Sequence, residues 1–313
     1  MNPRKIVLAG GSGFMGGLLA AHFEKLGWTC VVLTRHTPQP PQKSRREVQW
    51  DGMHRGAWES ALEGAEVVVN LCGQSVNCRY HARNRLTLME SRVRPTRLLG
   101  EVMAEMKTPP KVWLNASTAT LYRHTFGDPW DEDGEVGAHP DAKDAFSIDL
   151  AQAWEVAFQE SVPEGVRPVL LRSAMVLGRG KDANNVLSVL RRLTRLGLGG
   201  RMGHGRQFVS WIHERDLCRA LEWIVGHEAL EGVVNVCAPN PLPNQEMMRL
   251  LRKRLNRPFG LPAPAWALEL GAFFLRTETE LIIKSRRVVP GKLIASGFQF
   301  DFPEFGGAID ELL

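Results

Sequence analysis

A glycine-rich turn follows the first apolar run of the chain and restricts the fold more than any other feature. The turn leads into an apolar, helix-forming segment and consists of Gly10, Gly11, Ser12, Gly13, Phe14, Met15 and Gly16. Its glycines fit two spacings, Gly-x-Gly-x-x-Gly and Gly-x-x-Gly-x-x-Gly, both of which let a backbone approach a diphosphate at a helix N terminus. The alternative is a tight turn without a ligand, but the strand before it and the helix after it favour dinucleotide binding.

Short apolar runs alternate with longer segments of helical period through the first two thirds of the chain. Strands are predicted at residues 6–9, 30–34, 66–71, 111–115, 167–172 and 233–237. Helices are predicted at residues 16–26, 59–63, 84–106, 148–160, 183–195, 214–225 and 244–255. Several strand runs are apolar throughout, which is typical of strands covered on both faces. The pattern predicts an α/β fold with a Rossmann-type, doubly wound parallel sheet, whereas the Pro-rich and basic stretch at 38–46 predicts an exposed loop.

A change in composition after Ala238 predicts a second, smaller unit. Prolines stand at positions 239, 241, 243, 258, 262 and 264. We therefore expect a cofactor-binding Rossmann domain at residues 1–238 and a C-terminal subdomain at residues 239–313 on the substrate side.

The end of the second predicted strand distinguishes between the two nicotinamide cofactors. NAD-binding sites usually end this strand with a carboxylate that accepts a hydrogen bond from the ribose 2′-hydroxyl. Here the strand ends in Thr34 and Arg35, and no acid is present. A guanidinium can pair with the 2′-phosphate of NADP, so the sequence predicts NADP(H); the alternative is an ordinary surface arginine.

Composition excludes several other classes of protein. The 39 Lys and Arg against 34 Asp and Glu give a net charge of +5, which suits an anionic ligand but not specifically a nucleic acid. The five cysteines include no Cys-x-x-Cys pair, and no cluster has metal-ligand spacing, so we expect buried thiols and no metal. No apolar run reaches membrane-spanning length, and the early first strand leaves no room for a targeting segment. We therefore expect a cytoplasmic protein.

Several motifs together carry a family resemblance. They are the glycine turn, 70–73 (NLCG), 90–96 (ESRVRPT), 177–180 (LGRG), 203–207 (GHGRQ) and 210–213 (SWIH). With them the chain resembles the extended or atypical short-chain dehydrogenase/reductase superfamily, and within it the "epimerase family" branch, which is similar to nucleotide-sugar epimerases and carries a C-terminal domain of unknown function.

The resemblance implies roles for residues after the fourth strand of such a fold. Leu71, Cys72 and Gly73 are expected to line the adenosine and nicotinamide-ribose side of the cofactor. Cys72 replaces the usual alanine, and this small apolar exchange does not indicate thiol chemistry. For Arg92, on the following helix, two interpretations stand side by side: contact with the cofactor, or a solvated helix arginine.

The acid/base pair of the superfamily is missing from its usual place. In that family a tyrosine transfers a proton and a lysine four residues later lowers its pKa, yet the corresponding positions hold Phe146 and Leu150. Phenylalanine cannot transfer a proton, and leucine cannot depress a pKa. Ser117 and Tyr122 match the family's Ser-x-x-x-x-Tyr segment and are the candidate catalytic residues. The alternative for Tyr122 is a packed aromatic side chain. His213 is a candidate proton shuttle by residue type, and the alternative is a structural histidine.

Two functional hypotheses follow. The first is an NADP(H)-dependent oxidoreductase or epimerase-like enzyme, whose small-molecule substrate, with sugar nucleotides among the candidates, lies between the sheet edge and the C-terminal subdomain. The second is a non-catalytic NADP(H)-binding protein that senses the cofactor or supports a partner. The absent Tyr-x-x-x-Lys pair favours the second, and the surviving serine favours the first.

Overall fold

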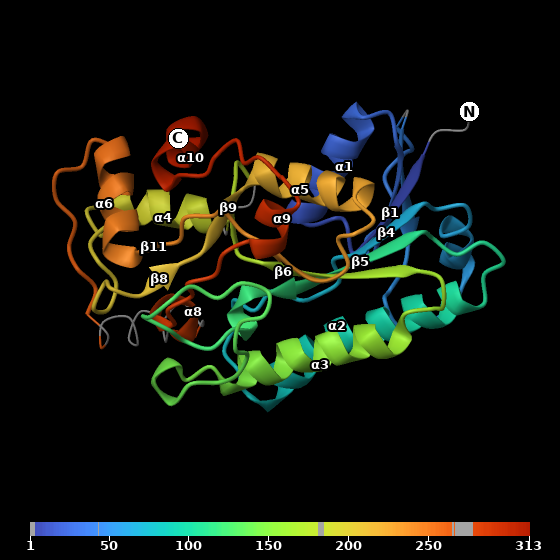
Figure 1. Cartoon of the computed structure of the whole chain (residues 1–313), viewed down its shortest axis with the longest axis horizontal. Helices are drawn as coiled ribbons and strands as arrows, with labels where there is room; N and C mark the ends of the chain where they lie inside the picture. Colours follow the sequence, from blue (N-terminus) through green and yellow to red (C-terminus); the bar gives the residue numbers. More distant parts are fainter. Residues whose placement is uncertain (1–3, 43, 181–184, 265, 267–277) are drawn as a thin grey trace.

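A seven-stranded parallel sheet forms the centre of the molecule (Figure 1). The structure is a computed structural model that describes residues 4–42, 44–180, 185–264, 266 and 278–313. The strands are β1 (Lys5–Ala9), β2 (Thr29–Thr34), β3 (Arg45–Gln49), β4 (Val67–Asn70), β5 (Val112–Thr118), β6 (Arg167–Ser173) and β10 (Gly232–Val236). They lie in the order β10-β6-β5-β4-β1-β2-β3. The order reverses between β1 and β4, which opens a crevice at the carboxyl ends of these strands. The predicted Rossmann-type sheet is confirmed.

The central strands are buried on both faces, because side chains alternate across the sheet. In β1, Ile6 and Leu8 pack into one apolar core and Val7 and Ala9 into another. All of β4 is buried as well. This two-sided burial explains the uninterrupted apolar runs in the sequence.

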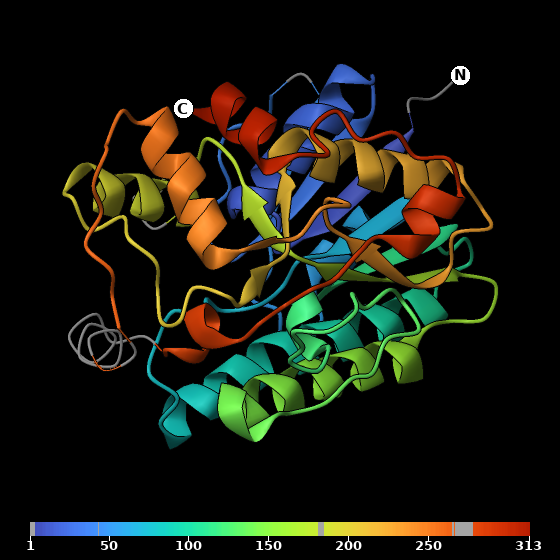
Figure 2. The same ribbon diagram turned by 60° about the vertical axis from the view of Figure 1, so that its left-hand side comes forward.

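Helices cover the two faces as separate layers (Figure 1, Figure 2). One layer holds α1 (Phe14–Lys25), α5 (Glu214–Gly226) and α9 (Gly291–Ala295). The other holds α2 (Ala82–Ala104), α3 (Ala145–Ser161) and a short 3₁₀ helix at Ala57–Ala61. Phe23 belongs to the first core, and Trp113 and Phe158 to the second, where their rings meet edge to face.

Two sequence predictions need correction. Part of the predicted loop at 38–46 belongs to β3, a polar edge strand. Among the described strands it pairs with β2 alone, so it lacks the apolar pattern of a central strand. The segment predicted as a helix at 59–63 is the 3₁₀ helix at Ala57–Ala61. The predicted start of a helix at residue 183 lies outside the described residues; α4 is described from Val186 to Arg195.

A smaller lobe lies beside the carboxyl edge of the sheet, at the left of Figure 1. Its core joins α4 to α6 (Asn244–Arg254) and α10 (Phe305–Leu312). Short strand pairs β7 (Met175–Leu177) with β9 (Trp211–His213), and β8 (Phe208–Val209) with β11 (Leu242–Pro243), connect it to the sheet. The helix α8 (Glu280–Ile283) returns toward α3. Among the described residues, no helix combines the length and apolar content needed to span a lipid bilayer.

Candidate functional site

The glycine turn between β1 and α1 has the shape of an anion-binding turn. Gly10 has a φ of +70°, which favours glycine, and a Cβ on Gly16 would lie 2.2 Å from the carbonyl oxygen of Gly11. A Cβ on Gly13 would meet nothing within 4 Å, so the turn is open on that side. Gly13 precedes α1, and no side chain caps the first N–H groups of this helix. The turn therefore offers free backbone donors and the positive end of a helix dipole.

A cavity of about 210 Å³ adjoins this turn at the crevice between β1 and β4. Of the residues predicted to bind a cofactor, it is lined by Gly10, Ser12, Arg35, Leu71, Cys72 and Gly73. Thr34 is instead buried, and its hydroxyl accepts a hydrogen bond from the His36 N–H at 3.3 Å. We call this space the first cavity.

Arg35 extends from the end of β2 into the first cavity. Its side chain is exposed and makes no hydrogen bond or ion pair with any residue that the structure describes. This guanidinium is therefore available to an anionic ligand.

The opposite wall of the first cavity was missed at the sequence level. Residues 50–53, directly after β3, line it together with Thr87, Glu90, Ser91 and Pro95 of α2. The Asp51 carboxylate turns back onto its own loop, where its bond to His54 lowers its pKa to about 2. The sequence offers little that could have indicated this wall, because the Trp-Asp-Gly sequence at 50–52 follows a stretch without the apolar pattern of a buried strand.

Cys72 closes the floor of the first cavity. Its backbone N–H binds the Asn70 side chain at 3.0 Å, and a Cβ on Gly10 would lie 3.0 Å from its Cα and Sγ atoms. Burial raises the pKa of the Cys72 thiol to about 12, so the group stays protonated at neutral pH. This agrees with the expectation of no thiol chemistry.

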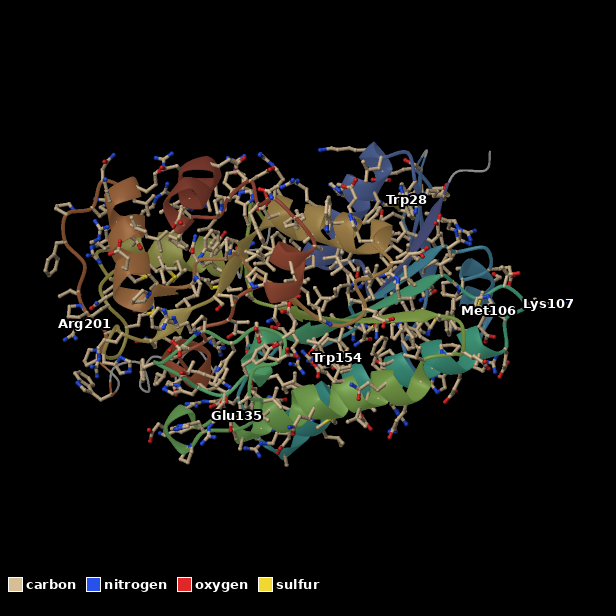
Figure 3. All side chains as sticks on the ribbon, in the orientation of Figure 1. Trp28, Met106, Lys107, Glu135, Trp154 and Arg201 are labelled. Carbon is tan, nitrogen blue, oxygen red and sulfur yellow. The ribbon has the colours of Figure 1, made fainter. Side chains whose placement is uncertain are left out.

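A second cavity of about 190 Å³ lies between β5, α2 and α3. It is lined by Val76, Tyr80, Arg92, Ser117, Thr118, Thr120, Ser147, Leu150, Ala151 and Trp154. Trp154 projects from α3 (Figure 3), and its indole N–H donates to Thr96 of α2 at 3.1 Å. Seven of these residues come from α2, from α3 or from the loop before α2, so no sequence motif predicted that they line one cavity.

Ser117 lies in the second cavity and is held by a buried ion pair. Its hydroxyl donates to the Glu155 carboxylate at 2.5 Å, and Arg172 binds both oxygens of that carboxylate at 2.9 and 2.8 Å. Since the serine proton is directed toward Glu155, the lone pairs of its oxygen are available to a hydroxyl group of a ligand.

Tyr122 does not line either cavity. It is 1% exposed, its hydroxyl donates to Asn235 at 2.8 Å, and the Arg172 guanidinium lies 4.9 Å from its ring centre. This placement favours the packed-aromatic interpretation.

Arg92 lies between the two cavities. Its guanidinium donates to the carbonyl groups of Leu88 at 3.1 Å and Gln74 at 3.0 Å, and it stands 5.2 Å from the Trp154 ring centre. It packs against Gly73 and pairs with no carboxylate among the described residues. Burial lowers its pKa to about 10, which still leaves it charged at neutral pH. Arg92 is thus a half-buried cation rather than a solvated helix arginine.

A charged segment from the C-terminal region contacts residues that line the second cavity. Glu280 binds the Ser147 hydroxyl. Lys284 forms a fully buried ion pair with Asp144 at 2.5 Å and donates to the Thr120 carbonyl at 2.5 Å. These residues stand more than 130 positions from their partners, and the sequence contains no local signal for the contact.

His213 is buried and packed against the C-terminal segment. Its ring stacks on Phe302 at 3.8 Å, Nδ1 accepts from the Arg215 N–H at 3.0 Å, and Nε2 faces Glu311 at 3.2 Å. The ring is 1% exposed. These contacts favour the structural-histidine interpretation.

Comparison with known proteins agrees with this architecture. The model of the NAD dependent epimerase/dehydratase family matches residues 6–237, and a domain of unknown function matches residues 263–312. The chain is 30% identical to the bovine "Epimerase family protein SDR39U1", with 99% of both chains covered.

Two solved structures are informative. One, of the human epimerase family protein SDR39U1 with NADPH, superposes with a TM-score of 0.84 at 28% identity and covers 98% of each chain. The other, a nucleoside-diphosphate sugar epimerase from Corynebacterium glutamicum, has a TM-score of 0.76 at 27% identity; it covers all of this chain and 58% of that one.

Proposed function

Because this chain belongs to the NAD dependent epimerase/dehydratase family, we propose that it is an NADP(H)-dependent oxidoreductase or epimerase-like enzyme acting on a small molecule. One observation carries the choice of cofactor: Arg35 enters the first cavity without a partner among the described residues. A guanidinium there can bind the 2′-phosphate that distinguishes NADP from NAD. The NADPH in the human relative supports this choice.

The proposed cofactor contacts follow the first cavity from the ribose phosphate to the nicotinamide. Arg35 takes the 2′-phosphate end, with Thr34 buried behind it at the end of β2, and Leu71, Cys72 and Gly73 take the adenosine and nicotinamide-ribose side. The diphosphate is held by Gly10, Gly11, Ser12, Gly13, Phe14, Met15 and Gly16. Arg92 contributes its charge from α2. The cofactor, when bound, supplies or accepts a hydride.

The second cavity is the proposed substrate site. The Ser117 oxygen there accepts a hydrogen bond from a substrate hydroxyl. Residues 239–313 are the proposed substrate-side subdomain, because Glu280 and Lys284 bind Ser147 and Thr120 on the cavity wall. For Tyr122 we propose a supporting role beneath Arg172 rather than proton transfer. The Corynebacterium structure, a nucleoside-diphosphate sugar epimerase, supports sugar nucleotides as the substrate class.

A turnover screen tests this proposal. The purified protein is mixed with NADPH and panels of carbonyl compounds and nucleotide sugars, while nicotinamide absorbance and sugar products are followed. We expect turnover of at least one compound, and a loss of that turnover in Ser117→Ala with NADPH binding retained.

A second candidate function is a non-catalytic NADP(H) sensor or partner-binding protein. Leu150 on the cavity wall, and Phe146 four residues before it, place apolar side chains where proton transfer would require polar ones. Tight NADPH binding without turnover of any compound in both panels would favour the sensor. Absence of NADPH binding would reject both functions.

A further inference from the structure

One tyrosine hydroxyl is buried in the wall of the second cavity. It belongs to Tyr80 and lies beside the Ser147 hydroxyl. Because Ser147 donates its own proton to Glu280, it can only accept a hydrogen bond from Tyr80. The Tyr80 proton is therefore held by a weak, neutral acceptor on a cavity wall, and a ligand oxygen that enters the cavity can take the place of Ser147 as that acceptor.

The position of Tyr80 is fixed by its backbone and its ring. Its N–H donates to the Glu278 carboxylate at 2.8 Å, and its carbonyl accepts from the Arg85 guanidinium at 2.7 Å. The ring meets that of Phe146 edge to face, with 4.9 Å between centres. Phe146 occupies the position where the family's tyrosine is expected. The phenol of Tyr80, from the loop before α2, therefore lies next to that position in α3.

The surroundings of Tyr80 suit proton donation. Burial raises the pKa of Tyr80 to about 12, so the phenol is protonated at neutral pH and can donate. The charged and titratable groups that act on it are Cys78, Glu278, Glu280, Arg92 and Arg286. The two arginines among them favour the phenolate after the proton has left.

We propose that Tyr80 is a catalytic acid/base residue that takes the place of the tyrosine missing at position 146. This inference rests on the proposed function. In the reductive direction the substrate carbonyl carbon accepts a hydride from NADPH, and its oxygen takes the Tyr80 proton. The C=O π bond and the Tyr80 O–H bond break, an alcohol and NADP⁺ form, and the phenolate regains a proton from water. Oxidation reverses each step.

Fluorine NMR tests the assignment without relying on turnover. The chain has only two tyrosines, so labelling with 3-fluorotyrosine gives two signals, which Tyr122→Phe assigns. The full-length protein is titrated with pH, alone and with saturating NADP⁺. We expect NADP⁺ to move the Tyr80 signal and to lower its pKa by about one unit or more, because the positively charged nicotinamide ring stabilises a nearby phenolate. The Tyr122 signal serves as the internal control.

The outcomes separate this inference from the proposed function. If calorimetry detects NADP⁺ binding but the Tyr80 signal and its pKa do not change, or Tyr122 responds instead, Tyr80 is not the acid. If no NADP⁺ binding is detected, the proposed function and the inference fail together. With any carbonyl compound that the wild-type protein reduces, Tyr80→Phe should lose about 100-fold or more of the rate at unchanged NADPH affinity. Full retention of the rate would also overturn the proposal.

Discussion

Replacing Arg35 by glutamine tests the choice of cofactor at its most specific point. Arg35 is exposed and makes no hydrogen bond or ion pair among the described residues, so its loss removes no internal contact. We therefore expect the free energy of unfolding to change by less than about 0.5 kcal/mol, as for other surface substitutions. Any change in ligand affinity then reports on the ligand rather than on the fold.

The expected loss of affinity follows from the contact that the guanidinium offers. A hydrogen bond to a charged group contributes about 1.5–3 kcal/mol, and solvent exposure of Arg35 places the value in the lower part of this range. A loss of about 1.5–2 kcal/mol corresponds to roughly 13- to 30-fold weaker NADPH binding. NADH lacks the 2′-phosphate, so its affinity should not change.

Titration calorimetry with NADPH and NADH measures both affinities in the wild-type protein and in Arg35→Gln. Arg195→Gln is the matched control, because this exposed arginine at the end of α4 carries the same charge but lines neither cavity. The wild-type protein and the control should prefer NADPH, and added salt should reduce the preference. An unchanged NADPH/NADH ratio in Arg35→Gln, or a wild-type preference for NADH, would refute the assignment of Arg35.

Three further predictions concern the turn, the buried ion pair and the thiol. Gly16→Ala places a Cβ 2.2 Å from a carbonyl oxygen of the turn and should weaken NADPH binding by about 10-fold or more, as measured by calorimetry. In the control Gly17→Ala, the new Cβ meets open space in the same helix, so urea unfolding should show a protein stabilised by roughly 0.5–1 kcal/mol. Lys284→Met leaves Asp144 buried without its counter-ion and should lower the free energy of unfolding by about 3–5 kcal/mol. The double variant with Asp144→Asn should recover most of this loss. If urea unfolding shows that the two losses add, the two residues are not coupled. With a pKa of about 12, Cys72 has roughly one thiolate in ten thousand at pH 8, so mass spectrometry should find it unmodified by iodoacetamide when a small free thiol is fully alkylated.

Local features of the sequence were sufficient for the sheet and for one half of the candidate site. The apolar runs predicted six of the seven central strands because parallel strands are buried on both faces. The glycine turn and Arg35 are adjacent to strand ends, and a doubly wound sheet brings the carboxyl ends of β1, β2 and β4 to one edge. Their meeting in the first cavity therefore followed from the strand order alone.

The edge strand β3 was missed for a physical reason. It pairs with one neighbour and keeps a polar sequence, so burial leaves no periodic signal in its residues. The residues after it, which form the far wall of the first cavity, were missed with it.

The sequence by itself determined the glycine turn and the parallel sheet, and it predicted the missing acid/base pair, since each depends on neighbouring residues or on a regular period. Only the tertiary structure decided where the side chains of the two tyrosines lie. Tyr122 follows β5 closely, but its hydroxyl is bonded to Asn235 from a strand more than 100 residues away. Tyr80, in a loop without a motif, is brought into the second cavity by Glu278 and Phe146. Contacts between such distant segments depend on how helices and loops pack, and no local pattern encodes that packing.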